Sequence, residues 1–221
     1  MDKKQITEAV EEALKGKGKR KFPQTVEAIF NFRGIDVSKP ENRINLDVIL
    51  PKGRGKEVPV VVFAESNMAM DAKNAGAAKV VGKSDIAKMR KEKKELKKLS
   101  KNSEFIAAPQ LMIEVGKNLG QVLGSAGKLP KPVIGNVENA IKQAKARVRI
   151  QTRGKYLPTV QCAIGSENMN VNDIAENFES VYEKLKDKVG LQSIASAYVK
   201  LTMGQAVKIG AVKEKEGEKK G

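Results

Sequence analysis

The spacing of hydrophobic residues changes twice along this 221-residue chain. Residues 2–15 place apolar side chains at helical spacing, with Gly16 as a stop, which predicts an amphipathic helix. Residues 25–33 then alternate between apolar and polar side chains, and residues 44–50 repeat this alternation. Since successive side chains of a strand point to opposite faces, the pattern predicts two half-buried strands with a polar outer face.

The middle of the chain has a different pattern, in which short apolar runs alternate with helical segments. The run 58–64 is continuously apolar, as is typical of a strand that is covered on both faces. The elements expected after it are an Ala-rich helix, a strand at 79–81, a long helix from Ser84, a strand at 105–108 and a helix around 111–115. Because strands and helices alternate, residues 58–146 are predicted to form a Rossmann-like α/β domain with a largely parallel sheet.

From residue 147 the period-two alternation returns. The elements expected there are strands at 147–153, 157–164 and 197–202, and a helix whose apolar stripe runs from Ile174 to Val189. Two strands before the insert and three after it are each too few for a stable sheet, whereas together they can form one antiparallel sheet with helices on one face. The predicted fold class is α/β: a discontinuous α+β domain of residues 1–57 and 147–221, with the Rossmann-like domain inserted.

Charge indicates the kind of partner. The chain has 42 Lys and Arg against 26 Asp and Glu, a net charge of +16 and a pI of about 9.8, so we expect a polyanionic partner, and nucleic acid is the leading one. No apolar run reaches the roughly 18 residues of a spanning helix. The first 15 residues are acidic as often as basic, so we expect a soluble chain without a signal peptide or a membrane partner.

Many of the charged residues lie in two segments. The run Lys88–Lys101 holds eight basic and two acidic residues, and a mixed Lys/Glu tail follows Ile209. We interpret the run as a solvated face that adds nonspecific affinity for RNA, because lysines without placed planar groups carry little sequence information. The tail is predicted to be a disordered, weakly electrostatic arm.

The residues that most often carry catalysis are nearly absent. The chain has no histidine, which removes the commonest general base and metal ligand. Its single cysteine, Cys162, alternates with Val160 and Ile164 on one strand face, so it is predicted to be a core residue in a reducing compartment. We therefore expect no enzyme, no metal and no cofactor.

The glycine-rich segment Gly124–Pro132 invites a nucleotide-binding interpretation, which its spacing does not support. A phosphate loop needs a glycine five residues before Gly127 and a Ser or Thr after Lys128, whereas this chain has Val122 and Leu129 there. A small-molecule enzyme built on the inserted domain is a rival hypothesis that this absence disfavours.

Three blocks in the right order resemble a known family. They are Phe22–Glu27, Gly124–Pro132 and Lys200–Gly204, and Pro40–Ile44 looks like the archaeal branch. Together they resemble the universal L-one family of large-subunit ribosomal proteins, archaeal type, over almost the whole chain. The family has the same two-domain plan that the hydrophobic pattern predicts. The chain departs from the family at Ser125 and Ala126, where the family usually has Pro or a basic residue.

The resemblance implies a structural protein of the large ribosomal subunit, located in the cytoplasm on the ribosome. Its implied partner is the stalk segment of large-subunit ribosomal RNA, and its implied work is to accompany release of exit-site tRNA. The family's members also repress translation by binding a similar fold in their own mRNA. A nonspecific nucleic-acid compaction protein is the alternative that composition alone leaves open.

The resemblance also implies an RNA-binding site at the ends of the chain. The residues carried over are Lys21, Phe22, Thr25, Glu27, Thr202, Met203 and Gly204, with Thr152, Arg153 and Lys155 expected as neighbours on the sheet edge. Short polar side chains suit ribose 2′-hydroxyls, and a glycine allows close approach of backbone. For Phe22 and Met203, burial in the core is the alternative that the pattern leaves open.

Overall fold

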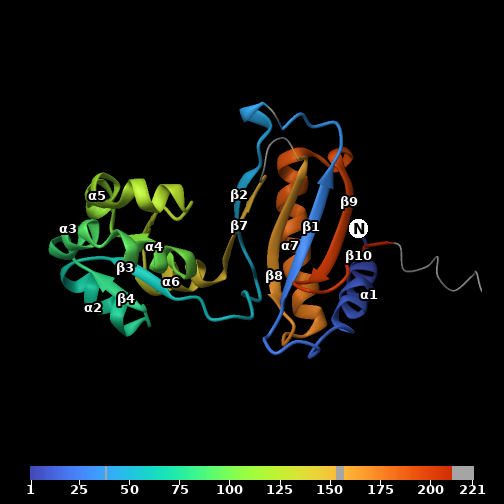
Figure 1. The fold of residues 1–221 in the computed structure, drawn as a ribbon, viewed down its shortest axis with the longest axis horizontal. Helices are drawn as coiled ribbons and strands as arrows, with labels where there is room; N and C mark the ends of the chain where they lie inside the picture. The colour runs from blue at the N-terminus through green and yellow to red at the C-terminus, as the bar shows by residue number, and fades with distance from the viewer. Residues whose placement is uncertain (38, 153–156, 211–221) are drawn as a thin grey trace, which may run out of the picture. The chain divides into compact units, whose positions relative to one another are not determined.

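The computed structural model describes residues 1–37, 39–152 and 157–210. The chain forms two compact units, one made of Met1–Lys56 and the chain from Ala146 onward, and the other made of Glu57–Lys145 (Figure 1). Each unit has a hydrophobic core of its own. The tail expected to be disordered lies, from residue 211, outside the described residues.

The first unit is built on a four-stranded antiparallel sheet in the order β10-β9-β1-β8. Its strands are β1 (Thr25–Phe32), β8 (Thr159–Ser166), β9 (Ile194–Leu201) and β10 (Val207–Lys208). The alternation predicted for β1 is confirmed, since Val26, Ala28 and Phe30 are buried and the residues between them are half-buried. β1 lies in the centre and pairs with β8 on one side and β9 on the other. The pattern did not predict β10.

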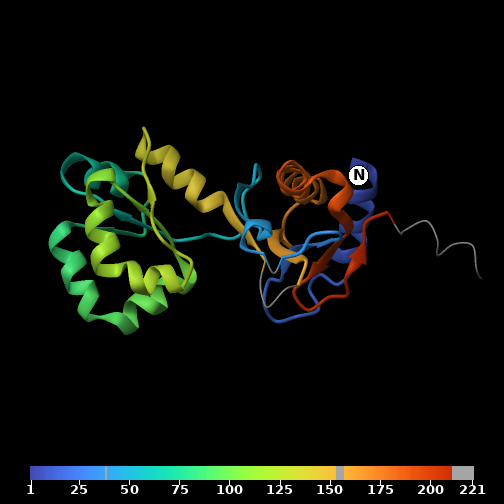
Figure 2. The ribbon, with the colours of Figure 1, turned by 90° about the horizontal axis from the view of Figure 1, so that it is seen from above.

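Helices α1 (Lys3–Leu14) and α7 (Val171–Val189) cover one face of this sheet, and the other face is open (Figures 1 and 2). Phe30 of β1 packs against Phe178 of α7, with ring centroids 5.1 Å apart. The buried stripes of both helices belong to one hydrophobic cluster with the sheet. The expectation of helices on one face of the sheet is confirmed.

The single five-stranded sheet expected for this unit is wrong. β2 (Asn45–Ile49) pairs antiparallel with β7 (Arg147–Gln151), and the two form a separate two-stranded sheet. One isolated bridge, between Thr152 and Val160, links β7's end to β8. Period-two alternation tells which face of a strand is buried, but it does not tell which strand pairs with which.

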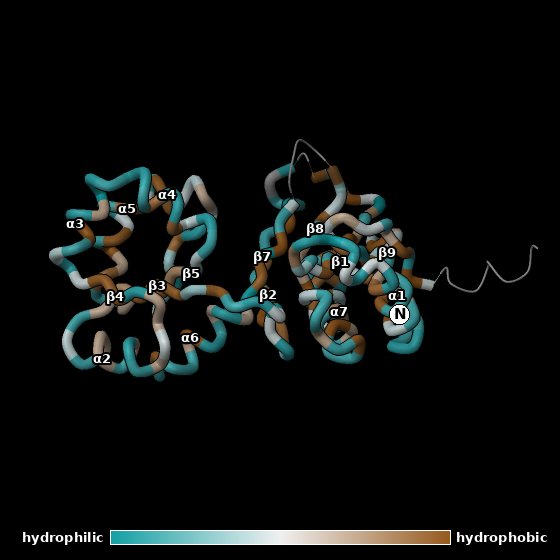
Figure 3. The backbone as a smooth tube through the Cα atoms, turned by 60° about the horizontal axis from the view of Figure 1, so that its bottom comes forward, coloured by the Kyte–Doolittle hydropathy of each residue, from teal (hydrophilic) through white to brown (hydrophobic). Residues whose placement is uncertain are grey.

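The second unit is a parallel sheet in the order β4-β3-β5-β6, buried on both faces. Its strands are β3 (Val60–Phe63), β4 (Lys79–Val81), β5 (Glu104–Ala107) and β6 (Lys131–Pro132). One face packs against α3 (Lys83–Lys91), α4 (Lys93–Asn102) and α5 (Met112–Ser125), and the other against α2 (Ser66–Asn74) and α6 (Val137–Ala146). Hydrophobic segments run along β3 and β5 in Figure 3, and the predicted Rossmann-like arrangement is confirmed.

Three details of this unit differ from the sequence prediction. The long helix expected from Ser84 is two helices, because the backbone leaves helical geometry at Glu92 (φ −93°, ψ 52°). α6 was not predicted. The glycine-rich segment is not a loop at its ends, since Gly124 and Ser125 complete α5 and the last two residues form β6. Short 3-10 helices occur in both units, at Pro109–Leu111 in the second and at Pro40–Asn42 and Leu191–Ser193 in the first.

Candidate nucleic-acid interface

The start of β1 and the end of β9 meet at one end of the four-stranded sheet, where Thr202 joins the two strands. The Thr202 amide donates to the Thr25 carbonyl oxygen at 3.0 Å. The Thr202 hydroxyl accepts from the Thr25 amide and donates to the Thr25 carbonyl, both at 3.2 Å. The hydroxyl hydrogen is therefore used within the protein, and one lone pair stays available for an outside donor such as a ribose hydroxyl.

Two large apolar side chains stand exposed beside this pairing. Phe22, three residues before Thr25, is 48% exposed, and Met203, directly after Thr202, is 58% exposed. Burial in the core, the alternative that the pattern left open for them, is therefore wrong. An exposed apolar pair beside polar groups is typical of a binding surface.

Gly204 closes the turn after β9. Its amide donates to the Leu201 carbonyl at 2.9 Å. A Cβ added to Gly204 would lie 3.1 Å from the Leu201 Cβ and 3.4 Å from the Leu201 nitrogen. The close backbone approach expected at this glycine is thus made within the protein's own turn, which presents Met203.

Gln24 and Glu167 are buried beneath this surface, and sequence analysis did not single them out. Gln24 is 2% exposed and Glu167 5% exposed. The Gln24 side chain donates to a Glu167 carboxylate oxygen at 3.3 Å and accepts from the Met203 amide at 3.1 Å. Gln24 lies inside the Phe22–Glu27 block, but no pattern marks a polar residue for burial, so only the fold reveals it.

The open face of the sheet is polar. Glu27 is half-buried near the start of the central strand β1, next to Lys200 on β9 and Ala163 on β8. Farther along, the Asn31 amide donates to Ser196 at 3.0 Å and its oxygen accepts from Thr159 at 2.7 Å, so one polar ladder crosses three strands. At Asn31 these groups are engaged with one another, so they hold the three strands together.

On the other side of β8, Cys162 belongs to the core, as predicted. Burial raises the pKa of its thiol to about 12, and the negative charge of Glu27 contributes a smaller part. The thiol is therefore neutral at physiological pH and does not take part in the surface chemistry.

The basic connector leads into the sheet end. Lys21 is exposed, and so are the basic residues Lys17, Lys19 and Arg20 before it. Gly18 in their midst has φ +74°, a left-handed conformation that L side chains rarely adopt. The connector thus brings exposed cations next to Phe22.

Thr152 lies at the sheet edge beside β8, away from this cluster, and its role in RNA binding stays a prediction. It bridges to Val160, which pairs with Phe30, whereas Thr25 pairs with Ser166 at the opposite end of β8. Five residues of strand separate the two positions along β1, about 17 Å at ~3.4 Å per residue. Arg153 and Lys155, expected beside Thr152, lie outside the described residues.

The glycine-rich segment offers less positive charge than its sequence implies. The Lys128 ammonium forms an ion pair with the carboxylate of Glu104, which is only 7% exposed. The Ser125 hydroxyl donates to the Val122 carbonyl at 2.9 Å. Both side chains are therefore engaged within the second unit.

The lysine face of the second unit is exposed as expected. The face consists of Lys93, Lys94, Lys97, Lys98 and Lys101 on α4, and in the part of the chain that the structure describes none of them forms an ion pair or hydrogen bond through its side chain. Leu96, on the opposite side of α4, is buried in the core. α4 therefore presents charge alone, with its apolar side already covered.

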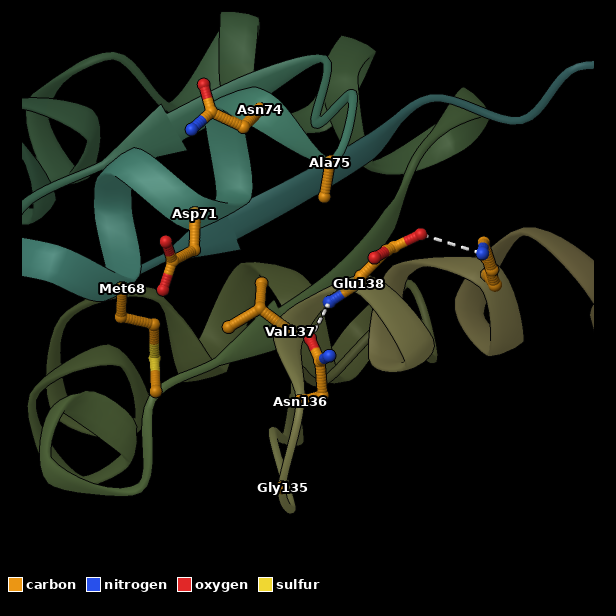
Figure 4. A pocket seen from close by; sticks show the side chains of 9 residues that line it. Met68, Asp71, Asn74, Ala75, Gly135, Asn136, Val137 and Glu138 are labelled. Carbon is orange, nitrogen blue, oxygen red and sulfur yellow. Dashed lines mark hydrogen bonds and ion pairs between the residues drawn. The ribbon is translucent and has the colours of Figure 1, made fainter.

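A cleft of about 750 Å³ lies between α2 and α6 in the second unit (Figure 4). Asp71 and Met68 of α2 face Val137 and Glu138 at the start of α6. Glu138 is paired with Lys142 at 2.7 Å, and the hydrogen bond and charge of Lys142 lower the pKa of Glu138.

The described residues contain no group of three or more metal-ligating side chains. No described helix is long and apolar enough to span a bilayer.

Taken together, a strongly basic chain, an exposed apolar pair on a polar sheet end and a face of unpaired lysines are features of the RNA-binding class of proteins. Residues 4–205 match the Ribosomal protein L1p/L10e family, and the chain belongs to this family. The resemblance stated from the sequence motifs is thereby confirmed. Since the family consists of structural ribosomal proteins, the expectation that the chain is not an enzyme is also confirmed.

Relatives among archaea match nearly end to end. The chain is 41% identical over 214 residues to the large ribosomal subunit protein uL1 of Archaeoglobus fulgidus, covering 95% of this chain and 99% of the relative. It is 39% identical to the protein of the same name from Methanothermobacter thermautotrophicus, over 93% and 98% of the two chains. The match to the Methanocaldococcus jannaschii protein is 40% over 98% and 100%.

Proposed function

We propose that this protein is a structural constituent of the large ribosomal subunit and binds the stalk region of large-subunit ribosomal RNA. The observation that carries the proposal is the sheet-end cluster, defined as Lys21, Phe22, Thr25, Glu27, Thr202, Met203 and Gly204, in which two exposed apolar side chains stand beside polar groups. The archaeal relatives are named as proteins of the large ribosomal subunit, which supports that subunit as the partner. A family of ribosomal proteins also implies a cytoplasmic, ribosome-associated location.

The chemistry of the cluster suits folded RNA. Phe22 and Met203 offer apolar surface on which an unstacked base or a ribose can pack, an interaction of about 1–3 kcal/mol per stacked base for aromatic side chains. The free lone pair of Thr202 and the Glu27 carboxylate can accept from 2′-hydroxyl groups, which distinguish RNA from DNA. Lys21 supplies a phosphate contact that positions the backbone without reading its sequence.

Two finer functions follow from the family resemblance. The stalk assignment implies that the protein accompanies release of exit-site tRNA during translation. A segment of its own mRNA that folds like the stalk would occupy the same cluster, so binding there would repress translation. Both functions use one RNA-recognising surface, and both are proposals for this chain.

Chemical footprinting on intact large-subunit ribosomal RNA tests the main proposal. We expect protection confined to the stalk region and binding that persists in part at high salt, because apolar and hydrogen-bonded contacts release no counterions. Protection spread along the RNA, with nearly complete loss of affinity at high salt, would instead identify a nonspecific nucleic-acid compaction protein.

A further inference from the structure

Phe22 and Met203 lie on segments outside the strand ladder, so something other than strand pairing must hold them in place. Phe22 precedes β1, and Met203 lies in the turn after β9. An exposed side chain on an unsupported segment would lose conformational freedom on binding and so bind less tightly. The support for both segments comes from below the surface, at Gln24.

The Gln24 side chain joins three separate segments. Its amide nitrogen donates to the Gly16 carbonyl at 3.4 Å and to the Glu167 carboxylate at 3.3 Å, and its oxygen accepts from the Met203 amide at 3.1 Å. A carboxamide has two N–H donors and one oxygen acceptor, so the three contacts use its donors fully. The Gln24 carbonyl also accepts from the Glu167 amide at 2.9 Å.

Glu167 is one of three partners that favour a single orientation of the Gln24 amide. With the amide turned around, its oxygen would meet the Glu167 carboxylate and the Gly16 carbonyl, and its N–H groups would meet the Met203 N–H. Acceptor would face acceptor and donor would face donor, in a site where both side chains are at least nine-tenths buried. The Glu167 carboxylate, the Gly16 carbonyl and the Met203 amide therefore all favour the orientation in which the Gln24 oxygen points at Met203.

We propose that Gln24 and Glu167 form a positioning pair, which fixes the connector at Gly16 and the turn at Met203 so that Phe22 and Met203 present one preformed surface to RNA. This inference rests on the proposed function, because it assumes that the sheet-end cluster binds RNA. Neither residue is expected to touch RNA, since both are buried.

Reversing the polarity of the pair tests the proposal. Gln24→Glu sets a second carboxylate against Glu167 and removes both N–H donors. Gln24→Glu/Glu167→Gln restores a donor facing an acceptor between positions 24 and 167, but it leaves a carboxylate oxygen facing the Gly16 carbonyl. At pH 7.5 we expect Gln24→Glu to bind stalk RNA about tenfold more weakly, as for one lost hydrogen bond, and the double variant to recover to within about threefold of the wild type.

The pH dependence of RNA affinity distinguishes the positioning pair from a merely structural role of the two residues. Because two adjacent carboxylates raise the pKa of one of them, Gln24→Glu should regain affinity as the pH falls from 7.5 to 5.5, relative to the wild type over the same range. Gln205→Glu is the control, since it adds the same charge at an exposed site two residues from Met203.

The outcomes separate the two proposals. Wild-type protein that does not prefer stalk RNA over an unrelated hairpin overturns the proposed function. Wild-type preference with unchanged binding by Gln24→Glu, an equal loss in Gln205→Glu, or no recovery in the double variant overturns the positioning pair. Should Gln24→Glu fail to fold, hydrogen exchange of the Met203 amide in Glu167→Leu decides: faster exchange supports the pair, and an unchanged rate contradicts it.

Discussion

The sheet-end cluster and the lysine face of α4 differ in the contacts that each can offer to RNA. The cluster carries few charges, and its backbone is fixed by the Thr25–Thr202 pairing and by the buried Gln24. The lysine face carries five exposed ammonium groups that no described side chain holds in place. The difference teaches that fixed geometry can recognise the shape of one RNA, whereas mobile charge attracts any polyanion.

Separating the two units should produce the largest difference in RNA affinity. A chain joining residues 1–57 directly to residues 147–221 should keep stalk-RNA affinity within about tenfold of the full protein, because the whole cluster lies in it. Residues 58–146 alone should bind at least about 100-fold more weakly, a difference of ~2.7 kcal/mol. Fluorescence titration with stalk RNA measures both, and equal affinity of the two pieces would contradict the predicted domain assignment.

Changing Thr202 to Ala and Met203 to Val removes contacts without changing charge. We expect a loss of stalk-RNA affinity of about 1–3 kcal/mol, the range for a lost hydrogen bond to a buried polar partner plus packing, with the salt slope nearly unchanged. Met70→Val is a matched control, because Met70 is 65% exposed in the second unit.

The same variant needs a check on its fold, since Thr202 also joins two strands. Reaction of Cys162 with a thiol reagent supplies the check, because the thiol is buried and its pKa is raised to about 12. It should react slowly in every correctly folded variant and quickly once the sheet opens. A variant that loses affinity and also exposes Cys162 would say nothing about the cluster.

Neutralising the lysine face should have the smallest effect on recognition. Replacing Lys93, Lys94, Lys97 and Lys98 by Gln should lower the slope of log affinity against log salt by on the order of one unit and weaken binding to unrelated RNA. Preference for the stalk over an unrelated hairpin should change little.

The matched control for that variant replaces Lys184, Lys186 and Lys188 of α7, which are exposed on the first unit. It removes similar charge from a helix on the covered side of the sheet, so any effect of net charge alone should appear in both variants. If the α4 variant loses its discrimination while the Thr202/Met203 variant keeps it, recognition lies on the lysine face and the cluster has been assigned to the wrong surface.

The sequence predicts the helices and strands better than it predicts which strands pair. The alternation in β1 and the apolar run in β3 identified the two kinds of sheet, because burial on one face or on both leaves a direct trace in residue type. Strand pairing leaves no such trace, so the separate β2–β7 sheet was missed. The break between α3 and α4 at Glu92 was also missed, because neither Gly nor Pro marks it in the sequence.

The candidate site shows the same limit. Family motifs identified Phe22 and Met203, whose exposure the fold then established. The distance of Thr152 from the cluster could not be predicted, because its place depends on the register of β8 against β1. Gln24 was not predicted, because two of its three side-chain hydrogen bonds reach residues more than 140 positions away.

The pairing of Thr25 with Thr202 joins residues 177 positions apart, across the whole of the second unit. At synthesis rates of about 5–20 residues per second, the N-terminal partner waits roughly 9–35 s for the other to be made. The second unit is complete well before that, so it can fold while β1 has no neighbour. A nascent chain therefore holds Phe22 before it holds the Met203 turn, so the proposed RNA-binding surface is complete only after residue 203 has been made.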